Sequence, residues 1–147
     1  MQASGTRAVL PHKILLVADS RNGLIARKTV LAENGYEVTI IDRAEQVLPL
    51  LEENRFNLLI TDYKLQKSTG AQLIAALRGA GHLQPVILIS GYVEALGLTE
   101  ANTGANLVVQ KGALEVPQLL HAVRTLLNVR KPPTSARPAQ PLRRRKA

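Results

Sequence analysis

The sequence predicts a single α/β domain in which helices cover both faces of an open, parallel, doubly wound β-sheet. Short runs rich in Ile, Leu and Val alternate with longer segments whose apolar residues recur at helical spacing. All but the second of the short runs are almost continuously apolar, which is typical of parallel strands buried on both faces. Five strands that alternate with five helices predict right-handed βαβ crossovers. The predicted strands are residues 13–18, 36–41, 57–61, 85–89 and 106–110.

The first and third predicted helices end at residues that favour helix ends, whereas the second contains a proline. Asn34 and Gly35 close the first helix. Pro49 falls inside the second helical pattern, so this helix is either kinked or begins late. The third helix closes between Gly79 and Gly81. Its apolar face consists of Leu73, Ile74 and Leu77.

The last two predicted helices differ in strength. Residues 93–103 form the weakest helical pattern, because Gly97 and Asn102 both disfavour a helix interior. Pro117 opens the final helix, since proline suits a first helical turn. The apolar face of this helix consists of Leu119, Leu120, Val123, Leu126 and Leu127.

Length and composition indicate a protein of one domain without disulfides or membrane spans. A chain of 147 residues has room for one domain with its own core and is short for two. It contains no cysteine, which excludes disulfides and thiol chemistry. No apolar run approaches the ~20 residues that span a bilayer, and the N-terminus lacks the pattern of a signal peptide. We therefore expect a soluble, cytoplasmic protein.

The net charge of +8 is concentrated at the C-terminal end. Residues 12–129 hold 11 Lys or Arg and 11 Asp or Glu, whereas residues 130–147 hold seven basic residues and no acidic one. This last segment is also proline-rich and has one Leu as its single large apolar residue, so we expect a disordered basic tail. The tail is expected to contact anionic surfaces weakly. The predicted organisation is an N-terminal extension at 1–11, a domain at 12–129 and the tail at 130–147.

Polar residues end four of the predicted strands. In an open parallel sheet these carboxyl ends lie along one edge, where ligands bind. We therefore expect Asp19, Asp62, Ser90 and Lys111 to converge there. Two carboxylates, a hydroxyl and an ammonium group suit phosphoryl transfer to a carboxylate. Asp62 would be the nucleophile, the carboxylates would hold Mg²⁺, and the other two groups would stabilise the phosphoryl oxygens.

The motifs at these strand ends resemble those of the receiver domain of two-component response regulators. Asp62 in ITDYKL, Gly70 eight positions later, Ser90 in ILISGY and Lys111 in VVQKG match the family's motifs in order. The resemblance covers residues 13 to about 129. It implies a flavodoxin-like (βα)5 fold with strand order 2-1-3-4-5.

The resemblance also implies a role for each site residue. Asp62 is the expected phosphoacceptor, and Ser90 and Lys111 are expected to stabilise the phosphoryl group. Mg²⁺ is the expected cofactor, bound by Asp19, Asp62 and the backbone carbonyl of Lys64. Tyr92 is the candidate switch residue.

Several positions depart from the family pattern. Ala18 replaces the first of two acidic residues usual after the first strand, which makes the acidic site atypical, and we expect it to weaken the affinity for Mg²⁺. The position of the aromatic switch in the fifth strand is Val108. Gln66 and Gly112 stand where prolines are usual.

The leading hypothesis is a single-domain phosphoacceptor in a phosphorelay, a signalling switch and not an enzyme. Its expected partners are a histidine kinase or histidine phosphotransfer protein, and a downstream target on the surface formed by the helix at 93–103, the strand at 106–110 and the final helix. The alternative is a degenerate receiver that serves as a protein-interaction module without phosphorylation. A nucleotide or cofactor binder is a weaker alternative, because no glycine-rich phosphate loop follows the first strand.

Overall fold

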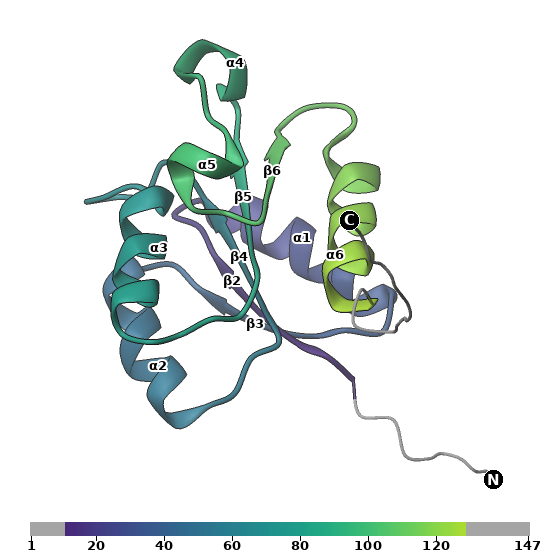
Figure 1. Ribbon diagram of the computed structural model, residues 1–147. Coiled ribbons are helices and arrows are strands. Elements are labelled where there is room, and N and C mark those ends of the chain that lie inside the picture. The colour runs from purple at the N-terminus through teal and green to yellow at the C-terminus, as the bar shows by residue number, and fades with distance from the viewer. Residues whose placement is uncertain (1–10, 129–147) are drawn as a thin grey trace, which may run out of the picture.

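The computed structural model describes residues 11–128 and contains one five-stranded parallel sheet (Figure 1). The order of the strands across the sheet is β3-β2-β4-β5-β6, which in chain order is the predicted 2-1-3-4-5. The predicted strands are confirmed, with ends shifted by about one residue. Their observed bounds are β2 Lys13–Val17, β3 Glu37–Ile41, β4 Leu58–Asp62, β5 Val86–Ser90 and β6 Leu107–Gln110.

Helices form a layer on each face of this sheet (Figure 1). The helices α1 (Arg21–Glu33) and α6 (Glu115–Asn128) cover one face. The other face is covered by α2 (Val47–Glu53), α3 (Gly70–Gly79) and the short helix α5 (Glu100–Thr103). A 3₁₀ turn, Ala44–Gln46, precedes α2, and the short helix α4 (Val93–Leu96) projects beyond the end of β5.

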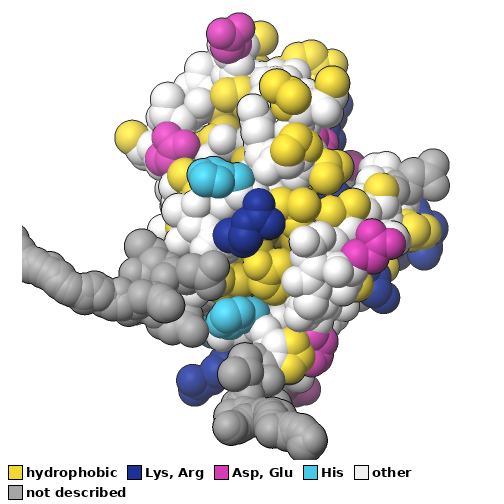
Figure 2. All heavy atoms as spheres, turned by 90° about the vertical axis from the view of Figure 1, so that its right-hand side faces the viewer, with side chains coloured by type: hydrophobic (Ala, Val, Ile, Leu, Met, Phe, Trp, Pro, Cys, Tyr) yellow, Lys and Arg dark blue, Asp and Glu magenta, His cyan; other side chains and the backbone are white. Residues whose placement is uncertain are grey.

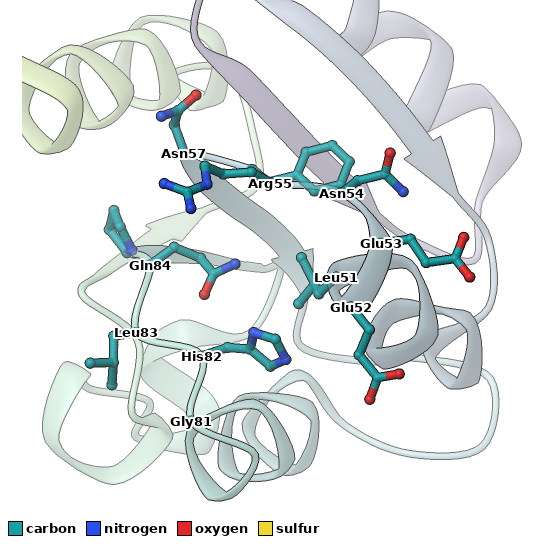
Figure 3. Close-up of a pocket in the computed structure, with 12 residues that line it drawn as sticks. Leu51, Glu52, Glu53, Asn54, Arg55, Asn57, Gly81, His82, Leu83 and Gln84 are labelled. Carbon is teal, nitrogen blue, oxygen red and sulfur yellow. The ribbon is translucent and has the colours of Figure 1, made fainter.

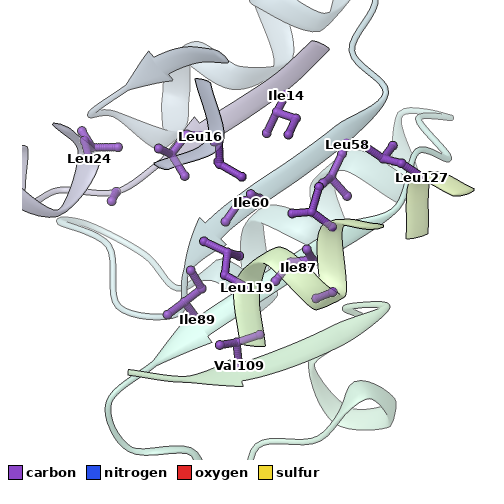
Figure 4. Close-up of a cluster of buried hydrophobic side chains, with 14 residues drawn as sticks. Ile14, Leu16, Leu24, Leu58, Ile60, Ile87, Ile89, Val109, Leu119 and Leu127 are labelled. Atoms are coloured by element: carbon purple, nitrogen blue, oxygen red, sulfur yellow. The ribbon is translucent and has the colours of Figure 1, made fainter. Parts of the chain in front are cut away.

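Alternate residues of the central strands supply the two halves of the core. Ile14 and Leu16 of β2 face α1 and α6, whereas Leu15 and Val17 face α2 and α3. Figure 4 shows the first of these clusters, in which strand residues meet Leu119 and its neighbours on α6. Every residue of β4 and β5 is buried, whereas the edge strands β3 and β6 are only partly buried. Continuous burial explains why these central strands are almost entirely apolar.

Two predicted helices need comment. Pro49 lies in the first turn of α2, so the interpretation that this helix begins late is correct, and no helical hydrogen bond is lost. The prediction of one helix at 93–103 was wrong. Gly97 adopts a left-handed conformation with φ of 64° and ends α4, and Thr99 then caps α5. Gly97 therefore breaks this segment instead of merely weakening it.

A hollow of the described surface lies at the amino ends of the strands. It measures about 630 Å³ and lies between the end of α2 and the loop before β5 (Figure 3). Asn57 and Pro85, which precede β4 and β5, line it. It is therefore at the opposite end of the sheet from Asp62. Among the described helices, none has the length and apolarity required to cross a bilayer. The predicted extension at 1–11, apart from Pro11, and the predicted basic tail lie outside the described residues.

Candidate functional site

Asp62 is the last residue of β4 and is only 2% exposed. The sheet holds its backbone in place, since Asp62 pairs with Ile89 of β5 and the Tyr63 amide donates a 2.7 Å hydrogen bond to the Ile89 carbonyl. A carboxylate is costly to bury unless it is paired. The strand therefore presents Asp62 to charged partners and not to bulk water.

Lys111 is the first of these partners. Its Nζ lies 3.6 Å from Oδ1 of Asp62, and its side chain is 42% exposed. The Lys111 amide donates a 2.9 Å hydrogen bond to the Ser90 carbonyl, which fixes the start of the loop after β6 beside the end of β5. The structure thus brings together two residues that are 49 positions apart, as the sequence predicted.

Arg27 of α1 is a second and closer partner, which the sequence analysis missed. Its Nη1 lies 3.1 Å from Oδ1 of Asp62, and its Nε donates a 2.9 Å hydrogen bond to Oε2 of Glu115 at the start of α6. Arg27 is 7% exposed. Leu24, Arg27 and Leu31 recur at helical spacing and are all buried, so a basic residue inside an apolar stripe was the signal available in the sequence.

Ser90 and Tyr92 follow β5 at the same edge of the sheet. Ser90 is buried, and its Oγ accepts a 3.0 Å hydrogen bond from the Tyr92 amide. This bond orders the turn after the strand. The side chain of Tyr92 is exposed, with 66% of the residue accessible, so it lies outside the core in this conformation. Ser90 ends the strand adjacent to Asp62, as predicted.

Asp19 and Ala18 follow β2 and behave differently. Asp19 is exposed, and among residues 11–128 it makes no ion pair. It does not cap α1, because Ser20 is the N-cap and accepts a 3.4 Å hydrogen bond from the Gly23 amide. Ala18 is fully buried in the core beneath the site. Its methyl group supplies no oxygen to a cation.

Gly70 begins α3 and packs against the backbone of the site. Its amide donates a 2.6 Å hydrogen bond to the Tyr63 carbonyl. A Cβ atom at this position would lie 2.5 Å from the carbonyl oxygen of Asp62 and 2.7 Å from Cδ1 of Leu88. The space accepts only glycine, which ties the loop between β4 and α3 to the strand that carries Asp62.

Comparison with known proteins shows the family to which the chain belongs. Residues 14–124 match the family model of the response regulator receiver domain. The chain belongs to that family. As a receiver it is 35% identical over 80 residues to the response regulator FleR of Pseudomonas aeruginosa, covering 54% of this chain and 17% of FleR. It is 28% identical over 109 residues to a response regulator receiver protein of Anaeromyxobacter sp., covering 74% of this chain and 46% of that protein.

The fold of this receiver also matches solved response regulators. The crystal structure of TrrA from Thermotoga maritima, in complex with Mg²⁺–BeF, has a TM-score of 0.69 at 24% identity, covering 79% of this chain and 99% of TrrA. This likeness shows the common fold. The chain spans less than half the length of each of the two curated relatives.

Charged groups of both signs meet at the receiver site, and the negative charge of Asp19 also acts on Asp62. Asp62 and Glu115 carry negative charge, and Arg27 and Lys111 carry positive charge. Burial raises the pKa of the Asp62 carboxyl above its ordinary value, although the charges of Arg27 and Lys111 oppose this rise. Burial by itself would lower the pKa of Arg27, but the hydrogen bond to Glu115 and the charge of Asp62 outweigh it, so the pKa of Arg27 is raised. Arg27 therefore stays cationic.

The raised pKa of Asp62 predicts a pH-dependent contribution to stability. A group whose pKa is higher in the folded state stabilises the fold fully below its unfolded pKa and loses this contribution as the pH rises through its folded pKa. The unfolded value for aspartate is about 3.9. Asp62→Asn mimics the protonated form, so wild type should lose stability relative to this variant as the pH rises above about 3.9.

Urea unfolding of both proteins at several pH values measures this difference. Asp42→Asn, at an exposed aspartate outside the site, is the control and should show no such trend. A difference that moves in the opposite direction would mean that the cations around Asp62 outweigh its burial.

The donors of this receiver do not fit a Mg²⁺ ion as they are arranged. Oδ1 of Asp62 already faces two cations, and Arg27 is held against it from the other side by Glu115. Ala18 offers no ligand. Within residues 11–128, no three side chains among His, Cys, Asp and Glu lie close enough together to hold a metal ion. Mg²⁺ is usually bound by one or two carboxylates together with several waters. At this site Asp19 is the second carboxylate, whereas Oδ1 of Asp62 is engaged by the two cations.

Proposed function

We propose that this receiver is a phosphorylation switch in which Asp62 accepts a phosphoryl group from a phosphohistidine. The supporting observation is that β4 fixes the Asp62 carboxylate with Nζ of Lys111 3.6 Å from Oδ1. A carboxylate oxygen would attack phosphorus, and the phosphorus–nitrogen bond of the donor would break, with its electron pair leaving on the imidazole. Lys111 would stabilise the phosphoryl oxygens as their charge redistributes, and the hydroxyl of Ser90 would donate a hydrogen bond to them.

Membership of the family supports this role. Receiver domains interact with histidine kinases and with downstream targets, and they generally bind Mg²⁺, as TrrA does in its Mg²⁺–BeF complex. On this basis the donor is a histidine kinase or histidine phosphotransfer protein. In this proposal the chain takes up one phosphoryl group per molecule and then changes its binding to a partner. That behaviour is that of a switch and not of an enzyme.

The proposed surface for the downstream partner lies beside α6. A groove of about 470 Å³ runs between β6 and α6, and most of its lining is apolar. Leu114, which lines the groove, and Val116, in the first turn of α6, are both exposed. In Figure 2, which views the molecule from the side of α6, hydrophobic side chains gather across this face. The groove is lined by Leu107, Val108, Val109, Leu114, Pro117, Gln118, His121 and Ala122.

Labelling with a small phosphodonor tests the proposed function. Incubation with phosphoramidate or acetyl phosphate should add one phosphoryl group, detected by intact mass. Asp62→Asn should abolish labelling because an amide is not a nucleophile. Lys111→Ala should reduce labelling, since its ammonium faces the oxygens of the transferred group. Asp42→Asn, at an exposed aspartate outside the site, is the matched control and should be labelled like wild type.

A second candidate function is a receiver that binds partners without phosphorylation. The specific observation in its favour is the ion pair between Arg27 and Asp62, which occupies an oxygen of the proposed nucleophile. Failure of wild type to be labelled by either small donor or by a phosphorylated histidine phosphotransfer protein would make this the better account.

A further inference from the structure

The buried guanidinium of Arg27 lies where the acidic site needs a cation. Its Nη1 is 3.1 Å from Oδ1 of Asp62 and is closer than Nζ of Lys111 at 3.6 Å. Unlike Lys111, which is 42% exposed, Arg27 is almost completely withdrawn from water. Arg27 is thus the nearer and the more deeply buried of the two positive charges at Asp62.

Arg27 is also fixed in this position from both ends. Its backbone belongs to the 13-residue helix α1, and its Nε donates to Oε2 of Glu115 at 2.9 Å. Nη1 of the guanidinium therefore binds the end of β4, and Nε binds the start of α6. An arginine presents several donors in a rigid plane, which suits such a bridge between two carboxylates.

A divalent ion that bound Oδ1 of Asp62 would have to break this bridge. Displacing Arg27 would strip a buried guanidinium of one carboxylate and place two further positive charges beside it and Lys111. Removing one ion of a buried pair costs stability, because the remaining charge is left without compensation. Ala18 is fully buried and offers no carboxylate to offset that cost.

We propose that Arg27 is a built-in cation that replaces the divalent metal of this receiver site, and that Glu115 is the residue that positions it. Arg27 and Lys111 then offset the charge of Asp62 without Mg²⁺. The bridge also couples the end of β4 to α1 and α6, so changes at Asp62 reach both helices directly. This inference rests on the ion pairs and does not depend on whether Asp62 accepts a phosphoryl group.

Binding of the metal itself tests the inference. Mg²⁺ titrated into wild type by calorimetry should show no saturable binding, and the melting temperature should not change. Ala18→Asp should also fail to bind while Arg27 is present. The double variant Ala18→Asp/Arg27→Met should bind Mg²⁺ and rise in melting temperature by several degrees at about 100 times its Kd. Ala18→Asp/Arg21→Met, which removes an exposed arginine of the same helix, is the matched control and should not bind.

A measurement on wild type tests the inference even if the variants fail to fold. Mn²⁺ broadens nearby NMR signals, and we expect the amide signals of Tyr63 and Gly91 to keep their intensity in the presence of Mn²⁺. Saturable Mg²⁺ binding by wild type that disappears in Asp62→Asn, or broadening of these two amides, would overturn the inference. Equal binding by Ala18→Asp with and without Arg27 would overturn it as well.

Labelling in Mg²⁺ and in EDTA separates this inference from the proposed function. Labelling of Asp62 to the same extent in both supports both proposals. Labelling that requires Mg²⁺, together with metal binding, would retain the phosphoacceptor and overturn the role of Arg27. Absence of labelling together with absence of metal binding would retain the role of Arg27 and overturn the phosphoacceptor.

Discussion

Gly70→Ala should destabilise the domain by about 3 kcal/mol, because the added methyl group has no free space. Its Cβ would lie 2.5 Å from the carbonyl oxygen of Asp62, which belongs to a central strand and cannot retreat without breaking the sheet. It would also lie 2.7 Å from Cδ1 of Leu88 in the core. Urea unfolding measures the loss. Because the nearest clash is with Asp62 itself, phosphoryl labelling should fall together with stability.

Gly79→Ala is the matched control, since it makes the same chemical change at the other end of the same helix. Apart from the neighbouring backbone of its own helix, no atom of the described residues lies within 4 Å of a Cβ built on Gly79. Replacing glycine with alanine in a helix should then be neutral or stabilise by up to about 1 kcal/mol. Similar unfolding midpoints for the two variants would show that the packing around Gly70 is looser than these distances indicate.

Arg27→Met should destabilise the domain by about 2–3 kcal/mol at neutral pH, close to the lower end of the range for breaking a buried ion pair. Methionine fills much of the same volume but leaves Asp62 with Lys111 as its remaining cation. The loss should be limited because burial already raises the pKa of Asp62, so this carboxyl can take up a proton. Chemical denaturation at neutral pH measures the effect.

Two further variants show whether the charge of Arg27 is the cause. Arg27→Met/Asp62→Asn should recover part of the lost stability, since residue 62 is then neutral, whereas the partly buried Glu115 still lacks its partner. Arg21→Met, at an exposed position on α1, should change stability by no more than about 0.5 kcal/mol. If Arg27→Met were as stable as Arg21→Met, the ion pair would carry little energy in solution.

Much of the fold could be predicted because it depends on local patterns. Strands β4 and β5 are buried on both faces. Strands in this position need apolar residues at almost every position, so each one is visible in the sequence as a nearly continuous apolar run. Asp62, Ser90 and Lys111 were found because parallel strands bring their carboxyl ends to one edge. Segment 93–103 was predicted less well, because a glycine can either remain in a helix or end it. Its backbone angle decides which, and the left-handed φ of Gly97 ends the helix.

By itself the sequence determined the alternation of strands and helices, the apolar faces that form the core and the polar residues that end the strands. Only the tertiary structure decided which charges meet at Asp62. Arg27 lies 35 residues from Asp62 and 88 residues from Glu115 in the chain, so no local pattern relates them. The packing of α1 and α6 on the same face of the sheet brings the three together. The pairing of buried charges depends on distances across the fold, whereas hydrophobic periodicity is a property of neighbouring residues.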